Sequence, residues 1–260
     1  MERKPQISFI IVNYNSKDYL EKCLASVFNN TQNISKEIIV VNSCDDILTH
    51  SEDIKIITAL ENKGFGYACN VGAKAAQGET LCFLNPDTEI VSDYFEKIIS
   101  EFEKDSAIGI IGPKLVDENN NNIQEWCAGK EVNLSDILLN NIGLKRSKKI
   151  WESNESVECA WVSGACLFIK KELFEKLKGF DENFFLYFED IDLCQRARNL
   201  GYKIIYNPKF TVKHFGGKSF EDKKKQKKLY YESQDYYFEK HFGKIATNLL
   251  KLIRSTVITR

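Results

Sequence analysis

Three carboxylates stand close together directly after a run of aromatic residues. The segment 184–192 reads Phe-Phe-Leu-Tyr-Phe-Glu-Asp-Ile-Asp and contains Glu189, Asp190 and Asp192. Carboxylates this close repel one another, which raises the pKa of at least one and suits a group that accepts a proton near neutral pH. A simpler explanation is that the acids begin a helix, because the helix dipole favours acids in a first turn. The apolar spacing after them is helical, and Gly201 is placed to end that helix.

A further acid, Asp87, follows an apolar run that we expect to be a buried strand, Thr80–Leu84. It stands in the sequence Asn85-Pro86-Asp87, where the proline holds the backbone extended just before the acid. A carboxylate at the end of a strand can bind a divalent cation that takes its other ligands from phosphates and water. An ordinary turn that the aspartate side chain stabilises explains the same residues without a ligand.

Two glycines precede a predicted helix in the segment 62–72, which reads Asn-Lys-Gly-Phe-Gly-Tyr-Ala-Cys-Asn-Val-Gly. Glycines at such a position allow the backbone to come close to a phosphate or a sugar. The dinucleotide-binding pattern of three glycines is incomplete, since Cys69 stands where the third glycine would be. This argues against an enzyme that uses a nicotinamide cofactor.

The first hundred residues supply the elements that must position these groups. Apolar strands are expected at 7–12, 37–41, 54–57 and 80–84, and helices at 18–28 and 67–76. Strands that alternate with helices predict an α/β fold with a mostly parallel sheet flanked by helices. Ligands bind at the carboxyl ends of the strands in such sheets. These ends are polar here, at 13–15, 42–46 and 85–87.

The second half has a different pattern. Strands of a small antiparallel or mixed extension are expected at 109–116, 122–126, 158–161 and 166–170. Residues 128–157 are polar and predict a short helix and a mobile loop. We expect residues 1–220 to form one domain and residues 221–260 to add a C-terminal helical extension.

Composition argues against several classes of protein. The formal net charge is −1, so nothing in the overall charge favours binding to nucleic acid. The eight cysteines form no C-x-x-C pair and mostly stand among apolar neighbours, which predicts reduced, buried thiols in a cytoplasmic protein. We find no apolar run long enough for a signal peptide or a membrane span.

The C-terminal extension opens with a basic run at 223–228 and continues with tyrosines on a predicted helix. Three explanations remain open for these residues. They can form a solvated helix face, they can contact anionic lipid headgroups at the inner face of the cell membrane, or they can form a homodimer surface.

Seven motifs follow one another in a specific order. They are 9–16 (FIIVNYNS), 62–72, 83–88 (FLNPDT), 161–165 (WVSGA), 179–185 (GFDENFF), 189–194 (EDIDLC) and 214–219 (HFGGKS). The ordered set resembles glycosyltransferase family 2, inverting enzymes of the Rossmann-like GT-A fold, and within it the rhamnosyltransferase-like branch. The resemblance implies inverting transfer of a hexose or a deoxyhexose such as rhamnose from a nucleotide-diphosphate donor. It also implies a cell-surface polysaccharide or a lipid-linked glycan as the acceptor.

The resemblance assigns roles on the donor side. It implies that Asp87 is a ligand for Mg²⁺ or Mn²⁺ and that His214 contacts the metal or the diphosphate, although a lone histidine is more often structural. Implied donor contacts are Asn13, Asn15, Asn42, Asn62, Gly64, Phe65, Asn70, Asn85, Lys218 and Ser219.

On the acceptor side, the resemblance implies that Asp190 is the general base and that Glu189 orients the acceptor. Trp161 would stack on a sugar face, and packing in the core explains this residue equally well. Asp192 is expected to be structural and to pair with Arg196. His50 and His241 have no such context and are expected on the surface.

One position departs from the family's pattern. Members usually carry an aspartate after the second strand, which accepts the N3–H of uracil or thymine, whereas Asn42 stands here. The carbonyl of Asn42 can accept that hydrogen bond without charge, or Asp45 can replace it. Asn42 and Asn85 are amides where the family tends to have acids. This keeps open a catalytically silent member that only binds a nucleotide sugar or a partner protein.

Overall fold

The computed structural model describes residues 4–46, 48, 51–59, 61–118, 122–141, 144–216 and 222–258. Nine strands in this part of the chain form one mixed sheet: β1 (Ile7–Asn13), β2 (Lys36–Asn42), β3 (Ile54–Thr58), β4 (Thr80–Leu84), β5 (Thr88–Ile90), β6 (Ile108–Val116), β8 (Val157–Cys159), β10 (Cys166–Lys170) and β11 (Lys203–His214). Their order is β3-β2-β1-β4-β10-β6-β11-β5, with β8 paired to β11. The predicted α/β class is confirmed.

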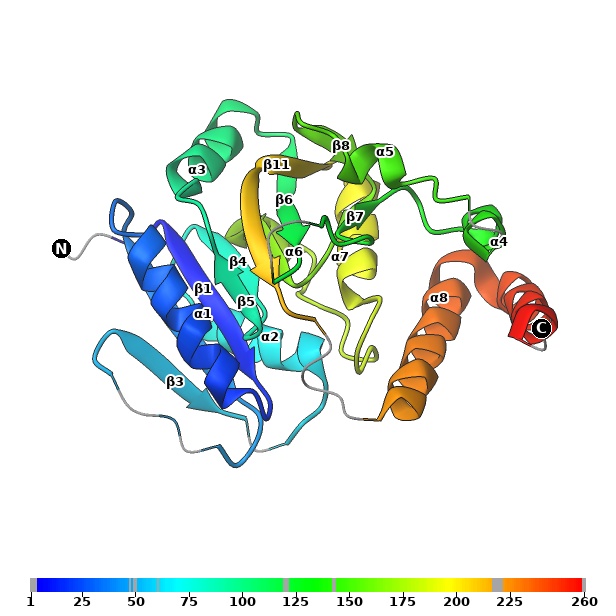
Figure 1. Ribbon diagram of the computed structural model, residues 1–260, viewed down its shortest axis with the longest axis horizontal. Coiled ribbons are helices and arrows are strands. Elements are labelled where there is room, and N and C mark those ends of the chain that lie inside the picture. Colours follow the sequence, from blue (N-terminus) through cyan, green and yellow to red (C-terminus); the bar gives the residue numbers. More distant parts are fainter. Residues whose placement is uncertain are drawn as a thin grey trace.

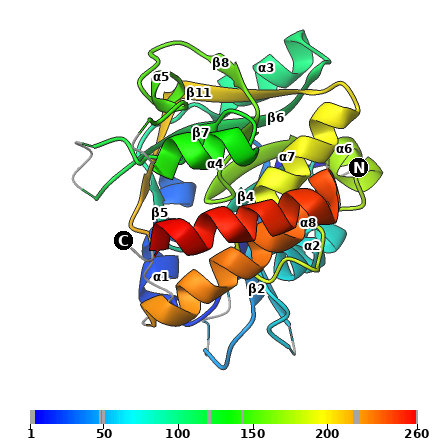
Figure 2. The same ribbon diagram turned by 90° about the vertical axis from the view of Figure 1, so that its right-hand side faces the viewer.

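The half of the sheet that comes first in the sequence is parallel. β1 pairs in parallel with β2 and β4, and β2 pairs in parallel with β3. β1 and β4 are buried along their whole length. The helices α1 (Lys17–Asn30) and α2 (Phe65–Ala75) lie on opposite sides of the sheet (Figures 1 and 2). Cover on both faces explains why these strands are continuously apolar in the sequence.

The other half contains the antiparallel pairs. β10 runs antiparallel to β4 and β6, whereas β11 runs parallel to β6 and antiparallel to β5 and β8. The predicted strand at 122–126 is wrong, since Ile123 forms only an isolated bridge with Val116. The predicted strand at 158–161 is divided into β8 and β9 (Trp161–Val162), and β9 pairs with β7 (Ala128–Gly129).

The remaining helices surround the second half. They are α3 (Phe95–Lys104), α4 (Leu134–Asn141), α5 (Lys148–Trp151), α6 (Lys171–Lys176), α7 (Glu189–Asn199) and α8 (Lys223–Ile258). Residues 128–157 therefore contain two helices where we expected one. α8 changes direction at Gly243, whose φ of 81° interrupts the helix, so a first arm (223–242) and a second arm (244–258) result.

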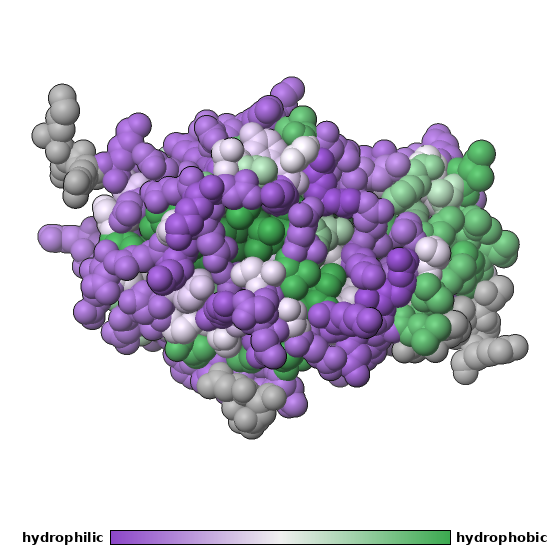
Figure 3. Space-filling view, turned by 90° about the horizontal axis from the view of Figure 1, so that it is seen from above, coloured by the Kyte–Doolittle hydropathy of each residue, from purple (hydrophilic) through white to green (hydrophobic). Residues whose placement is uncertain are grey.

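α8 covers the end of the molecule that is remote from β3 (Figure 1). Its buried side chains form a second hydrophobic cluster with residues that precede α7: Phe184, Phe188, Tyr237, Phe238 and Leu250. Figure 3 shows hydrophobic residues on the surface at the same end, where Figure 1 places α4 and the second arm of α8. None of the helices that the structure describes is both long and apolar enough to cross a membrane.

Candidate active site

The polar residues that follow β1, β2 and β4 meet at one edge of the sheet. They line a cavity of about 580 Å³, which we call the strand-end cavity. Asn15 follows β1, Ser43 follows β2, and Asn85 and Asp87 follow β4. Asn62, Gly64 and Phe65, at the start of α2, also line it. The carboxyl ends of parallel strands gather these side chains, because the strands run in one direction.

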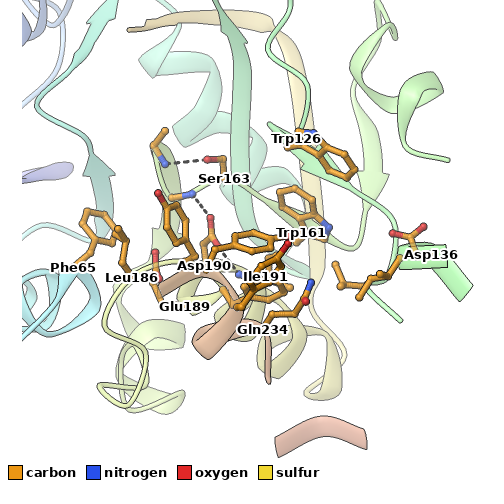
Figure 4. A pocket seen from close by; sticks show the side chains of 18 of the residues that line it. Phe65, Trp126, Asp136, Trp161, Ser163, Leu186, Glu189, Asp190, Ile191 and Gln234 are labelled. Atoms are coloured by element: carbon orange, nitrogen blue, oxygen red, sulfur yellow. Dashed lines mark hydrogen bonds between the residues drawn. The ribbon is translucent and has the colours of Figure 1, made fainter. Parts of the chain in front are cut away.

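A neighbouring cavity of about 670 Å³ lies between the sheet, α7 and α8, and we call it the helix-side cavity (Figure 4). Glu189 and Asp190 of α7 line it, and so do Tyr230 and Leu250 of α8. The two cavities share five residues: Phe65, Asn85, Leu186, Tyr187 and His214. The two cavities are therefore adjacent and have these side chains as a common wall.

Asp190 lies at the start of α7, and backbone amides hold its carboxylate. Oδ2 accepts a 2.7 Å hydrogen bond from the N–H of Gly164, and Oδ1 accepts a 2.8 Å bond from the N–H of Ile191 (Figure 4). Burial raises the pKa of Asp190, while these amides act in the opposite direction because they favour the ionised form. The side chain is therefore a positioned carboxylate that binds a proton more strongly than usual.

Glu189, the neighbour of Asp190, is buried. Among the residues that the structure describes, nothing donates a hydrogen bond to its Oε2. Burial raises the pKa of Glu189 well above its usual range, and the charge of Asp190 raises it further. Since only Asp190 has amide donors on both oxygens, we infer that Asp190 carries the negative charge and Glu189 keeps its proton.

The two residues expected at a metal lie side by side. Nε2 of His214, at the end of β11, is 3.5 Å from Oδ1 of the buried Asp87. No group of three or more His, Cys, Asp or Glu side chains that could hold a metal occurs within the described ranges. The pair therefore fits a divalent cation that takes most of its ligands from a diphosphate and water.

Gln124 orients the imidazole of His214, and nothing in the sequence pointed to it. Its Nε2 donates to the carbonyl oxygen of His214, so its Oε1 is the atom that lies 2.8 Å from Nδ1. Nδ1 then donates to Oε1, and in the neutral tautomer that fits this bond the lone pair is on Nε2, toward Asp87. Metal-binding histidines commonly have such a partner on the other ring nitrogen.

The loop before α7 has an unusual backbone. Tyr187 and Phe188 both have positive φ, near 69° and 67°, which is uncommon for large side chains and tends to occur at functional sites. The first arm of α8 holds this loop. Nε2 of Gln226 donates to the hydroxyl of Tyr187 at 2.7 Å, and Oγ of Ser233 donates to the carbonyl of Leu186 at 2.7 Å.

Gly64 is required by the packing of the chain against Phe185. Its φ is 106°, and a Cβ atom at this position would lie 2.3 Å from the carbonyl oxygen of Phe185. The N–H of Phe65 donates to that same carbonyl at 3.0 Å. The glycine therefore lets the start of α2 come close to the loop that precedes α7. The sequence pattern predicted for this glycine only a close approach of the backbone to a ligand.

Three expected donor contacts lie elsewhere. Asn13 is buried and donates to Oδ1 of Asn42 at 2.8 Å, so the carbonyl of Asn42 is already engaged. Asn70 exchanges two hydrogen bonds with the backbone of Phe180, each of 2.9 Å. None of these three asparagines lines either cavity. Their side-chain amides make hydrogen bonds inside the protein, although Oδ1 of Asn13 has no partner within the described residues. A contact of these three residues with the donor stays a prediction.

Asp45, the alternative to Asn42 for binding the base, is exposed and does not line the strand-end cavity, so its role stays a prediction. Ser43 lines it instead, and its buried hydroxyl has no hydrogen-bond partner within the described part of the chain. Lys225, at the start of α8, also lines this cavity and was not predicted. Lys218, Ser219 and His50 lie outside the described residues.

Two tryptophans face the helix-side cavity (Figure 4). Trp161 is buried, and its Nε1 donates to the carbonyl of Lys130 at 3.0 Å, so both of its expected roles, cavity wall and packing, are compatible with its position. Trp126 is 46% exposed and packs edge-on against the buried Trp151. Its exposed ring offers a larger free surface to a ligand.

Asp192 is structural, as expected, but it has more partners than Arg196. Its carboxylate accepts from Nε of Arg196 at 2.7 Å, and it lies 2.6 Å from Nζ of Lys240 and 2.8 Å from Nε2 of His241. The prediction that His241 is a surface residue is wrong, because Asp192 draws it into a largely buried contact. This cluster joins α7 to α8. Burial alone would raise the pKa of Asp192, but the bond from His241 and the two positive charges lower it.

Known proteins share this architecture. The model for glycosyl transferase family 2 matches residues 8–178, more than half of the chain. Rhamnosyltransferase WbbL of Escherichia coli (strain K12) is 27% identical over 224 residues, which cover 80% of this chain and 83% of that protein. N-acetylglucosaminyl-diphospho-decaprenol L-rhamnosyltransferase of Mycobacterium tuberculosis (strain CDC 1551 / Oshkosh) is 23% identical and covers 79% of this chain and 74% of that protein.

A solved structure shows the same fold. The mannosyltransferase PcManGT from Pyrobaculum calidifontis, in complex with GDP-Man and Mn²⁺, superposes with a TM-score of 0.62 at 18% identity. The match covers 92% of this chain and 64% of that one. At this identity the likeness shows the GT-A fold alone. The family match establishes that the chain belongs to glycosyl transferase family 2 and is a glycosyltransferase, and its relatives include rhamnosyltransferases.

Proposed function

We propose that this enzyme transfers a hexose or a deoxyhexose such as rhamnose from a nucleotide-diphosphate donor, with inversion, to a lipid-linked glycan or a growing cell-surface polysaccharide. The observation that supports this most is the wall of residues that the two cavities share. Asp87 lines the strand-end cavity, Asp190 lines the helix-side cavity, and Asn85 and His214 line both. A donor on one side and an acceptor on the other would meet at this shared wall.

The donor diphosphate would lie beside Asp87 and His214 in the strand-end cavity. These two side chains would hold Mg²⁺ or Mn²⁺, and PcManGT was solved with GDP-Man and Mn²⁺. When bound, such a cation would neutralise charge on the diphosphate leaving group. Lys225 lines the same cavity and would add a positive charge for the phosphates. Asn15, Asn62, Phe65 and Asn85 would contact the rest of the donor.

Asp190 would act as the general base. It would take the proton of the acceptor hydroxyl while that oxygen forms its bond to the anomeric carbon, and the bond from this carbon to the diphosphate would break on the opposite side. The raised pKa of Asp190 suits a group that must accept a proton. Glu189, protonated and adjacent, would help to orient the acceptor. Inversion requires no enzyme nucleophile in this scheme.

The acceptor would occupy the helix-side cavity. Trp126 and Trp161 offer aromatic faces to a sugar, and Tyr230 and Leu250 of α8 supply an apolar wall suited to a lipid-linked acceptor. The mycobacterial relative is named for a decaprenol diphosphate acceptor and for rhamnose transfer. We further propose that residues 1–220 form the catalytic domain and that 221–260 form an extension that completes its acceptor side.

A transfer assay with a panel of UDP-, dTDP- and GDP-sugars, including dTDP-rhamnose, tests this function. We expect turnover of one donor class, loss of turnover with chelator, recovery with Mn²⁺, and a product whose anomeric configuration is inverted by NMR. A product with retained configuration would contradict the role of Asp190. Turnover that chelator leaves unchanged would contradict the role of Asp87.

A further inference from the structure

Positive charge is concentrated on α8. Its 36 residues contain nine Lys and Arg against three Asp and Glu, a formal charge of +6, whereas the whole chain carries −1. Figures 1 and 2 show that both arms of α8 lie at one end of the molecule, near α4. The helix α8 is therefore basic and the rest of the chain is acidic, although Lys240 of α8 pairs with Asp181 and Asp192. Such a charge distribution favours association with an anionic surface.

The second arm of α8 also presents an unpartnered apolar row. Ile245, Leu249 and Leu252 are 87%, 47% and 61% exposed. They lie four and three residues apart, so they share one face of the helix. Leu250 points the other way and is fully buried. Large apolar side chains that line up on the surface usually mark a contact with a membrane or another protein.

Lysines accompany this row. Lys244 and Lys251 have side chains that are 84% and 53% exposed. Lys244 lies 3.9 Å from the exposed Glu239, and Lys251 lies 3.5 Å from the partly buried Asp235. Long lysine side chains can keep their charge among lipid headgroups while apolar neighbours enter the acyl region. An amphipathic helix with this composition lies in the plane of the interface and does not cross the bilayer.

We propose that α8 docks the protein on an anionic lipid surface, with Ile245, Leu249 and Leu252 inserted at the level of the headgroups. A second copy of the chain is the less suitable occupant. In a two-fold contact each α8 would face the other, and the two +6 charges would repel one another. An anionic bilayer is complementary in charge to the basic helix and in polarity to the apolar row.

Docking would also place the helix-side cavity next to the lipid surface. Leu250 and Arg254 line that cavity from the opposite side of the same arm, so one helix would contact both the lipid and the cavity. An amphipathic molecule held in the bilayer could then reach the cavity without leaving the membrane. Lipid docking itself does not depend on the proposed transfer reaction, and it can be tested without donor or acceptor.

Vesicle co-sedimentation of the full chain tests the proposal. The lipids are phosphatidylcholine with phosphatidylglycerol, against phosphatidylcholine alone. We expect binding to the anionic vesicles only, weakening with salt, and a loss of roughly tenfold or more in I245S/L249S/L252S. The variant K244Q/K251Q should weaken binding less, by a few fold. The matched control V91S/L200S replaces exposed apolar residues far from α8 and should bind like the parent chain.

Three results would overturn the proposal. They are equal binding to both vesicle types, unchanged binding of I245S/L249S/L252S, and an apolar face that makes the protein dimeric without binding lipid. Analytical ultracentrifugation of the parent chain and the triple variant separates the last result from docking. Because the replaced side chains are exposed, the thermal midpoint should stay unchanged. A failure of docking together with intact transfer to a soluble acceptor would leave the proposed function standing.

Discussion

The backbone N–H of Gly164 donates a 2.7 Å hydrogen bond to Oδ2 of Asp190, and this bond connects the turn before β10 to the start of α7. The carboxylate is thereby held at the wall of the helix-side cavity, while its other oxygen accepts from Ile191. A general base needs this kind of positioning, because the rate depends on the distance to the proton it removes.

We therefore predict that Asp190→Asn lowers the rate of transfer by about 10²–10⁴-fold and leaves donor affinity unchanged. The amide has the same shape but cannot accept the proton. Single-turnover kinetics and a donor-binding titration check the two parts separately. Asp53→Asn, at an exposed position, is the control. Near-normal transfer by Asp190→Asn in a folded protein would show that another group is the base.

Glu189→Gln should stabilise the protein increasingly as the pH rises. Glu189 has a raised pKa in the folded state, whereas in the unfolded chain it ionises near pH 4.3. Above that pH the unfolded state releases a proton that the folded state keeps, so the glutamate favours unfolding more at higher pH. Glutamine has no such dependence.

Thermal unfolding of Glu189→Gln and of the parent chain at about pH 5 and about pH 8 measures the effect. The difference in melting temperature should grow between the two pH values. For the control Glu21→Gln, on the exposed face of α1, the difference in melting temperature from the parent chain should be the same at both pH values. A constant difference would mean that Glu189 is ionised in the folded protein.

Gln124→Leu should weaken the binding of Mn²⁺ by about tenfold, because loss of a partner on the second ring nitrogen leaves the imidazole of His214 less well oriented. The measurement is a titration of Mn²⁺ followed by electron paramagnetic resonance in the presence of UDP. His214→Ala should lower the affinity for Mn²⁺ more than Gln124→Leu does. Gln195→Leu in α7 is the matched control. Equal affinity for Mn²⁺ in Gln124→Leu and in the parent chain would show that Gln124 does not position His214.

Asp192→Asn should lower the free energy of unfolding by about 3 kcal/mol, since it removes the buried carboxylate that Arg196 contacts, while Lys240 keeps only Asp181. The pKa of Asp192 is lowered in the folded state. Its stabilising contribution is therefore present above about pH 4 and is lost as the pH falls through the folded pKa. Urea unfolding near neutral pH and in acid should show a smaller acid-induced loss in Asp192→Asn than in the parent chain. Asp93→Asn at an exposed site should behave like the parent chain.

Trp126→Ala should raise the KM for the acceptor several-fold, because the ring is exposed to the helix-side cavity and the remaining wall is intact. Hydrolysis of the donor by water should continue at the parent rate. Leu144→Ala, which also removes an exposed apolar side chain, is the control. An unchanged KM would place the acceptor sugar elsewhere in the cavity.

The parallel half of the fold and the location of the acids could be predicted from the order of the residues alone. Continuous apolar runs such as Ile7–Asn13 and Thr80–Leu84 had to be covered on both faces, and strands covered in this way are typical of parallel sheets. Polar residues that follow such strands then meet at one edge, whatever the later part of the chain does. For this reason Asp87 and Asn85 could be predicted at a cavity.

Hydrogen bonds between residues that are distant in the sequence could not be predicted and are seen only in the folded chain. Asn70 looked available for a ligand, yet its amide is used by Phe180, 110 residues later. His241 looked exposed, yet it binds Asp192, 49 residues before it. Gln124 had no motif around it, and its role depends on β11 bringing His214 beside it. A polar side chain can serve a ligand or the protein, and its type and local spacing do not distinguish the two. Only the folded chain shows which group forms a hydrogen bond with it.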